Sequence, residues 1–131
     1  MRKLKLKKGD NVIVSIIKGS DRARGIDMSF NNIEDWIYPG EVLSATNRYI
    51  TVMIKQLDKV EKFDIELDYK QKVTRGSSNY KLYTSINEIA DEEKSKMITE
   101  YLQKVFNPYS GVHLSLGALE KIKDIVDKEL K

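Results

Sequence analysis

The chain has 131 residues, of which 40% are hydrophobic and 33% are charged, with a formal net charge of +3 at neutral pH. It has no cysteine, which excludes disulfides, thiolate metal ligands and cysteine nucleophiles. It also has no apolar run of the about 20 residues that span a bilayer, and its start lacks the apolar segment of a signal peptide. The length fits one domain with a modest core, and we expect a soluble, cytoplasmic protein that does not contact a membrane.

The positive charge is concentrated near the start of the chain. Up to Arg24 there are eight Lys or Arg against two Asp, a net of +6, so the rest of a chain whose total is +3 carries −3. We place this charge on the first strand and on the loop that follows it. The main cations are Lys3, Lys5, Lys7, Lys8, Arg22 and Arg24.

The first predicted strand covers residues 12–17 and follows a turn at Lys7-Lys8-Gly9-Asp10. Its apolar residues fall on both faces, as in a strand curled into a barrel. Residues 18–21 have turn chemistry, and residues 22–25 extend it into a basic loop. Residues 26–38 fit either an alternating strand or a loop with a short helical turn, and Pro39-Gly40 ends this stretch.

Residues 40–54 predict a β-hairpin, with a turn at Thr46-Asn47 and a return strand that begins at Arg48. In the return strand, Tyr49 lies on the face opposite Ile50. Residues 63–69 alternate between apolar and polar and predict a third, half-buried strand. A weaker strand pair contains Val73 and Leu82, with a polar loop at 75–79 between them.

The pattern changes from strand to helix at Ser85. The run Ser85-Ile86-Asn87-Glu88 predicts a capping box at the start of an amphipathic helix, which Asn107-Pro108 ends. A second helix begins at Ser115 and continues an apolar stripe. The predicted fold is therefore α+β, with an antiparallel barrel of five or six strands over residues 1–84. A helical hairpin over residues 85–131 is predicted to pack on the barrel as part of one compact domain.

The basic residues are the strongest functional signal. If the first strand and its loop are adjacent, their cations form one patch of the kind that contacts phosphates. Tyr49 and Trp36 add base stacking if they are exposed. The alternative is that terminal lysines only increase solubility. Trp36 itself either caps the barrel or anchors a protein partner.

No pattern of residues predicts catalysis. The carboxylates lack the spacing of a calcium loop or of a catalytic pair, and the alternating acids of residues 64–68 fit a solvated face. His113 is the only histidine and has no cysteine or second histidine with which to bind zinc. We therefore predict no metal, no cofactor and no enzymatic activity.

Four short patterns follow one another along most of the chain. They are Lys8-Gly9-Asp10-x-Val12-x-Val14, Arg48-Tyr49-Ile50-Thr51-Val52, Asn79-Tyr80-Lys81-Leu82-Tyr83, and Leu114-Ser115-Leu116 followed by Leu119 and Ile122. In this order they resemble small SH3-like β-barrel proteins of phages, prophages and other mobile elements of Firmicutes. Gly117 departs from the pattern, since an acidic residue starts a helix better, and residues 28–38 have no counterpart. The resemblance implies a small binder that modulates host machinery, including inhibitors of nucleic-acid-directed defence.

The first hypothesis is a non-catalytic phage or mobile-element accessory protein whose basic face contacts nucleic acid or a nucleic-acid-handling complex. Its predicted contacts are Lys5, Lys7, Lys8, Arg22, Arg24 and Arg48, with Trp36 and Tyr49. One alternative is a protein inhibitor or adaptor that uses Trp36, Tyr38 and the acidic helix face around Asp91. Another is a protein that sequesters a small nucleotide with Arg48 and Tyr49. The oligomeric state is open, and a homodimer through strand edges or the helix stripe is one option.

Overall fold

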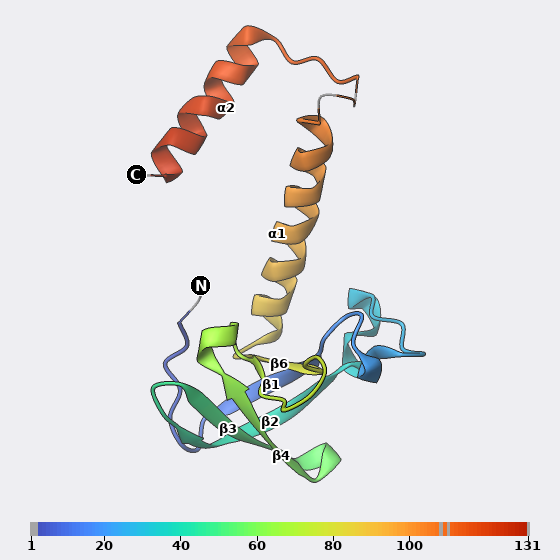
Figure 1. The fold of residues 1–131 in the computed structure, drawn as a ribbon, viewed down its shortest axis with the longest axis vertical. Helices are drawn as coiled ribbons and strands as arrows, with labels where there is room; N and C mark the ends of the chain where they lie inside the picture. The colour runs from blue at the N-terminus through green and yellow to red at the C-terminus, as the bar shows by residue number, and fades with distance from the viewer. Residues whose placement is uncertain (1–2, 108, 110, 131) are drawn as a thin grey trace. The chain divides into compact units, whose positions relative to one another are not determined.

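A computed structural model of the chain describes residues 3–107, 109 and 111–130. The chain divides into two compact units, Met1–Glu92 and Glu93–Lys131. The first unit contains the β-strands and the start of the first helix, and the second contains the rest of that helix and a second one (Figure 1).

The first unit is a closed antiparallel barrel in which each strand pairs with the next and β6 returns to β1. Among the described residues there are six strands: β1 (Asn11–Ile16), β2 (Ile37–Ala45), β3 (Tyr49–Ile54), β4 (Lys59–Asp64), β5 (Lys70–Gln71) and β6 (Tyr80–Tyr83). Short 3-10 helices connect them: η1 (Asp21–Ala23), η2 (Phe30–Asp35), η3 (Lys55–Leu57) and η4 (Ile65–Leu67). Together with the two helices, this barrel confirms the predicted α+β fold class.

The barrel has a core because its strands bury alternate side chains. In β3, Ile50, Val52 and Ile54 are at most 1% exposed, while the residues between them are only half-buried. The predicted faces of this strand are therefore correct. Every described residue of β6 is buried, and Val14 of β1 pairs with Leu82 of β6 where the barrel closes.

The predicted strand over residues 63–69 is correct for Phe63 and Asp64 and wrong from residue 65 on. β4 ends at Asp64, and η4 follows at Ile65–Leu67. The Asp64 carboxylate caps η4 by accepting a hydrogen bond from Glu66 N at 3.0 Å. Asp68 and Tyr69 then adopt positive φ angles of 54° and 62°, which a strand does not allow. The strand does not continue as the alternating pattern predicts, because the Asp64 carboxylate binds a backbone N–H group that strand pairing would otherwise use.

The start of the chain also differs from the prediction. The basic segment is not part of a strand, since β1 begins at Asn11. Leu4 and Leu6 are packed against the core, while the lysines between and beside them are exposed. Leu4 N donates a hydrogen bond to Tyr69 Oη at 2.8 Å, which ties this segment to the barrel. The lysines therefore face solvent from a segment that is tied to the barrel.

The structure also shows the conformation of two segments for which the sequence pattern was ambiguous or weak. The stretch 26–38 contains η2 and the first residues of β2, so the loop with a helical turn is the correct alternative. The weaker strand pair is reduced to the two residues of β5 and the four of β6, and Val73 lies outside both.

The first helix, α1 (Ile86–Val105), begins close to the predicted cap. Glu88 N donates to Ser85 Oγ at 3.3 Å, as a capping box requires. The Glu88 carboxylate, however, accepts from Thr84 N at 2.8 Å. In a capping box this carboxylate accepts from the backbone N of the cap residue, here Ser85, so the observed hydrogen bond is shifted by one residue. The second helix, α2 (Leu116–Glu129), begins next to the predicted start at Ser115, whose Oγ caps it by accepting from Ala118 N.

The first turns of α1 belong to the barrel unit. Ile89 is 3% exposed and is part of the barrel core. Glu92 accepts hydrogen bonds from Lys81 Nζ at 3.0 Å and from Tyr83 Oη at 2.8 Å. The packing of the whole helical hairpin on the barrel as one compact domain stays a prediction. Within the described residues, neither helix is long and apolar enough to cross a membrane.

Candidate nucleic-acid interface

A tyrosine surrounded by cations lies on the outer side of the barrel. Tyr49 begins β3 and is half-buried. Its ring centroid is 5.2 Å from Arg48 Cζ, 5.3 Å from Lys62 Nζ and 4.6 Å from Lys72 Nζ. We call these four residues the Tyr49 cluster. Cations within about 6 Å of an aromatic ring are attracted to the negative charge of its face, so Tyr49 holds three flexible side chains near one point.

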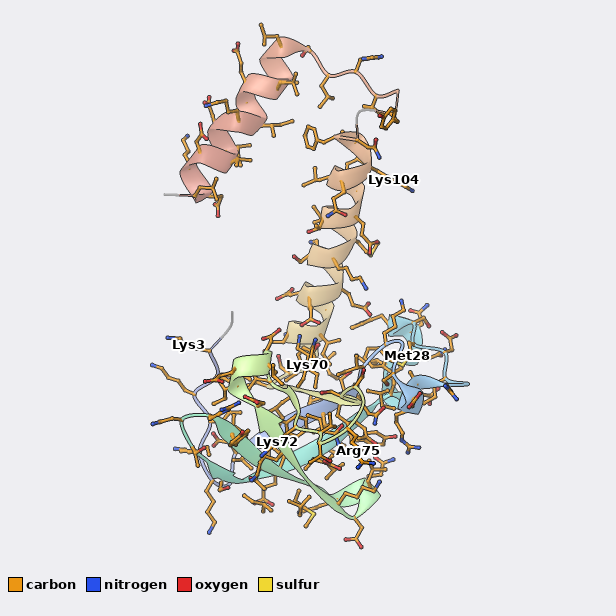
Figure 2. All side chains as sticks on the ribbon, viewed as in Figure 1. Lys3, Met28, Lys70, Lys72, Arg75 and Lys104 are labelled. Atoms are coloured by element: carbon orange, nitrogen blue, oxygen red, sulfur yellow. The ribbon has the colours of Figure 1, made fainter. Side chains whose placement is uncertain are left out.

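The strand register explains why these residues meet. Thr51 pairs with Lys62 between β3 and β4, which places Lys62 diagonally across from Tyr49. Lys72 follows β5, and its backbone N donates to Lys62 O at 2.7 Å. Tyr49, Lys62 and Lys72 thus form a row across three neighbouring segments, and Figure 2 labels Lys72 on this part of the barrel.

Arg48 is held in place by two carboxylates. The turn between β2 and β3 is stabilised by the Thr46 hydroxyl, which accepts from Tyr49 N at 3.0 Å. The Arg48 guanidinium lies 3.5 Å from Asp64, whose side chain is 4% exposed, and 3.4 Å from Glu66. The hydrogen bond to Asp64 and the charge of Glu66 raise the pKa of Arg48 above its ordinary value. Arg48 is therefore charged at every physiological pH, but its charge is partly compensated.

Lys62 and Lys72 have no such compensation. Both are exposed, and in the described part of the chain neither has a carboxylate within salt-bridge distance. Two uncompensated ammonium groups beside a third cation repel one another, and a bound anion relieves that repulsion. The cluster therefore has the charge arrangement of an anion-binding surface. The sequence did not point to either lysine. Lys62 can be recognised only from its diagonal position across from Tyr49, and that position requires the strand register.

The N-terminal lysines lie toward the same end of the barrel as this cluster. Gly9 N donates to Val42 O near the end of β2 that leads to the Arg48 turn. Leu4 contacts Tyr69, and Tyr69 N donates to the backbone oxygen of Asp64, the partner of Arg48. The lysines of this segment that we predicted to contact nucleic acid are exposed and can extend the basic surface. They are Lys5, Lys7 and Lys8.

Arg22 and Arg24 do not join this surface, so the condition for a single patch, that the N-terminal lysines and the arginine loop are adjacent, is not met. The N-terminal segment meets the start of β1, and the arginines follow its end, about 17 Å away at roughly 3.4 Å per residue. Figure 2 shows Lys3 and Met28, which follows the arginine loop, on opposite sides of this unit. Arg22 Nε donates to Tyr80 Oη at 3.2 Å, which raises the pKa of Arg22, and Arg24 pairs with Asp21 at 3.3 Å. These arginines stabilise their own loop.

Trp36 is part of the core. Its side chain is 3% exposed and its indole N–H donates to Ser29 O at 3.0 Å. The interpretation that it caps the barrel fits this position, whereas the interpretation that it is exposed for stacking or for a partner is wrong. Tyr38, which the adaptor hypothesis used with Trp36, is also buried, at 9% exposed.

Metal binding finds no support in the described residues. No group of three or more His, Asp or Glu side chains there is arranged to hold a metal ion. His113 is exposed in the segment between the helices. The absence of a cofactor and of enzymatic activity stay predictions.

These features define a small closed β-barrel with a basic surface centred on an aromatic side chain, followed by two helices. The chain belongs to the phage ProQ C-terminal-like domain family, whose model matches residues 1–129. No curated protein and no solved structure matches the chain. The family confirms the phage association that the sequence patterns implied, while the SH3-like relationship and the Firmicutes origin stay predictions.

Proposed function

We propose that this phage-family protein binds single-stranded nucleic acid through the Tyr49 cluster, without catalysis. The observation that carries the proposal is the arrangement of three cations around one tyrosine ring, two of them without a carboxylate partner. Single-strand binders combine positive charge that follows the backbone with aromatic rings on which bases stack.

Each residue of the cluster has a part in this mode of binding. Lys62 and Lys72 contact successive backbone phosphates, because their ammonium groups are exposed and free of carboxylates. Arg48 contributes a third cation, positioned by Asp64. A base that stacks on Tyr49 takes the place of one of the lysines over the ring. The N-terminal segment offers further phosphate contacts through Lys5, Lys7 and Lys8.

Unpaired bases fit this surface better than a duplex does. Reading the major groove requires an α-helix or a two-stranded ribbon that enters it. The cluster lies instead on the outer face of a closed barrel, where side chains and not a protruding element meet the ligand. The same chemistry is found in RNA and in single-stranded DNA, and the experiment distinguishes the two. The counter-defence role stays a prediction.

The test is fluorescence anisotropy with labelled single-stranded RNA, single-stranded DNA and duplex DNA over a range of salt concentrations. The wild-type chain is expected to bind single strands more tightly than duplex, with affinity that falls as salt rises. For the K62Q/K72Q variant, the slope of log affinity against log salt should decrease by about 1.4, since each phosphate contact of a single strand contributes roughly 0.7. The Tyr49→Leu variant should lose affinity with little change in slope, because stacking is not ionic.

The matched control is K18Q/K59Q. Both lysines are exposed on the barrel unit, and Lys59 lies at the end of β4 opposite to Asp64. This variant loses the same charge but should keep the wild-type slope. An equal change in the two double variants, or no binding at low salt, would contradict the proposal. Binding of mononucleotides alone would favour the nucleotide-sequestering alternative.

A further inference from the structure

The helical unit has no core of its own. None of the described residues from 93 to 130 is buried. Of the eighteen exposed large hydrophobic residues in the described chain, thirteen lie in this unit. Eight of them form stripes on the helices, and the other five lie between the helices or after α2. The stripe residues are Met97, Ile98, Tyr101 and Leu102 on α1 and Leu116, Leu119, Ile125 and Val126 on α2.

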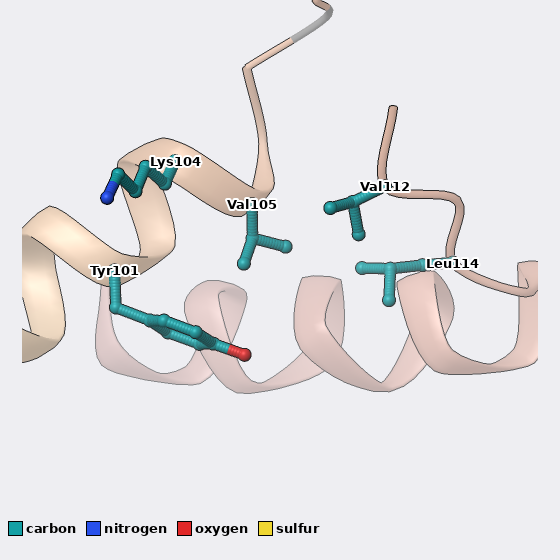
Figure 3. A pocket seen from close by; sticks show the side chains of 5 residues that line it. All are labelled: Tyr101, Lys104, Val105, Val112 and Leu114. Carbon is teal, nitrogen blue, oxygen red and sulfur yellow. The ribbon is translucent and has the colours of Figure 1, made fainter. Parts of the chain in front are cut away.

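The two helices do not cover each other's stripes. Figure 3 shows Val105 of α1 facing Val112 and Leu114 of the segment that precedes α2. Between them is an open cavity of about 530 Å³, which Tyr101 and Lys104 also line. Four of its five lining side chains are aliphatic or aromatic. An apolar space of this size next to exposed apolar helices needs a covering surface.

The barrel unit does not offer a matching apolar surface. Its exposed large hydrophobics are few and lie on different elements: Phe30 on η2, Leu43 on β2, Val60 on β4, Leu67 on η4 and Ile86 at the start of α1. Nucleic acid is a poorer fit, since the stripe side chains are apolar and Lys104 is the one cation among the five residues that line the cavity.

A second copy of the helical unit does match. Residues 93–131 contain six acidic and seven basic residues, a net charge of +1, so charge repulsion between two copies of this unit is weak. The eight stripe side chains, at about 50 Å² of apolar area each, offer roughly 400 Å². Each partner buries about 800 Å² in a stable interface, of which about 65% is apolar in homodimers, so the stripes supply most of the roughly 520 Å² of apolar area that is needed.

We propose that two copies of the chain associate through these stripes to form a symmetric four-helix bundle, with side chains of one copy filling the cavity of the other. The occupant of the apolar surface is thus a second copy of the same chain. This inference does not depend on nucleic-acid binding, because it uses no residue of the Tyr49 cluster.

The test is the mass of the full chain by sedimentation velocity over a range of concentrations. The wild-type chain should sediment as a dimer, at twice its 15.1 kDa. The variant L119Q/V126Q, which makes the α2 stripe polar, should sediment as a monomer. The control E120Q/D124N changes two exposed residues on the opposite side of α2 and should remain a dimer.

A second variant, M97Q/Y101Q, alters the α1 stripe and should give the same shift to monomer. Circular dichroism of each variant checks that its helix content is unchanged. A wild-type chain that is monomeric at every concentration would overturn the proposal, as would stripe variants that stay dimeric with intact helices. A monomeric wild type whose melting temperature falls in L119Q/V126Q would show that the barrel of the same chain covers the stripe.

Discussion

Asp64 connects the fold to the candidate site through one side chain. Its carboxylate caps η4 by accepting from Glu66 N at 3.0 Å, and it accepts from Arg48 at 3.5 Å. Because Asp64 is only 3% exposed, its charge needs both partners to offset its desolvation. The same residue ends β4, turns the chain and fixes the arginine beside Tyr49.

Replacing Asp64 should therefore affect stability more than replacing the other carboxylate near Arg48. We expect Asp64→Ala to lower the free energy of unfolding by about 1–3 kcal/mol, because Glu66 N loses the acceptor that caps η4 and Arg48 loses the buried one of its two carboxylate partners. The control is Glu66→Ala, since Glu66 has a side chain that is 67% exposed, and it should cost within about 0.5 kcal/mol. Urea denaturation followed by tryptophan fluorescence measures both. Equal losses in the two variants would mean that burial of Asp64 has no special role.

The sequence predicted correctly the features that depend only on residues close to one another in the chain. Alternation placed Ile50 and Tyr49 on opposite faces of their strand, and the start of the second helix near Ser115 was correct because it depends only on residues nearby in the chain. The approach of Lys62 and Lys72 to Tyr49 was missed because it depends on strand register. Whether the basic groups would meet was open for the same reason, since it depends on which end of β1 each one follows.

At the scale of the elements, two glycines lie in opposite surroundings. One is between closely packed strands, where a side chain does not fit, and the other is on an open helix surface, where it does. Gly40 lies in β2, and a Cβ at this position would be 2.6 Å from Cγ1 of Val52, which is fully buried. Gly117 lies in the first turn of α2, where a Cβ would meet no atom within 4 Å. The sequence marked Gly117 as a poor helix starter, and the structure gives no packing reason for it.

The two glycines should therefore respond oppositely to alanine. Gly40→Ala should destabilise the barrel by about 1–3 kcal/mol, since the added methyl forces Val52 or a strand to move. Gly117→Ala should increase the stability of α2 by up to about 1 kcal/mol, because alanine favours the helix. Thermal unfolding followed by circular dichroism reports both changes. A stable Gly40→Ala barrel would show that β2 and β3 are packed less closely than described.

At the scale of the whole molecule, α1 belongs to both units. Its first turns are fixed to the barrel by the buried Ile89 and by Lys81, which lies 2.9 Å from Asp68 and 3.0 Å from Glu92. All of these contacts lie before residue 93, where the second unit begins. The residues that complete the barrel therefore end before the apolar stripes begin. This separation suggests that nucleic-acid binding and self-association can be removed independently.

A chain that ends at Lys96 should separate the two properties. It keeps the Tyr49 cluster and the Lys81 contacts with Glu92, and it lacks the stripes on α1 and α2. We expect its barrel to have the same free energy of unfolding, extrapolated to water, as the barrel of the full chain, within the about 10–15% uncertainty of that extrapolation. It should bind a short single-stranded oligonucleotide with unchanged affinity and sediment as a monomer. A shortened chain that is unfolded would mean that the barrel needs the helical unit for stability. Retained dimerisation would place the interface on the barrel strands.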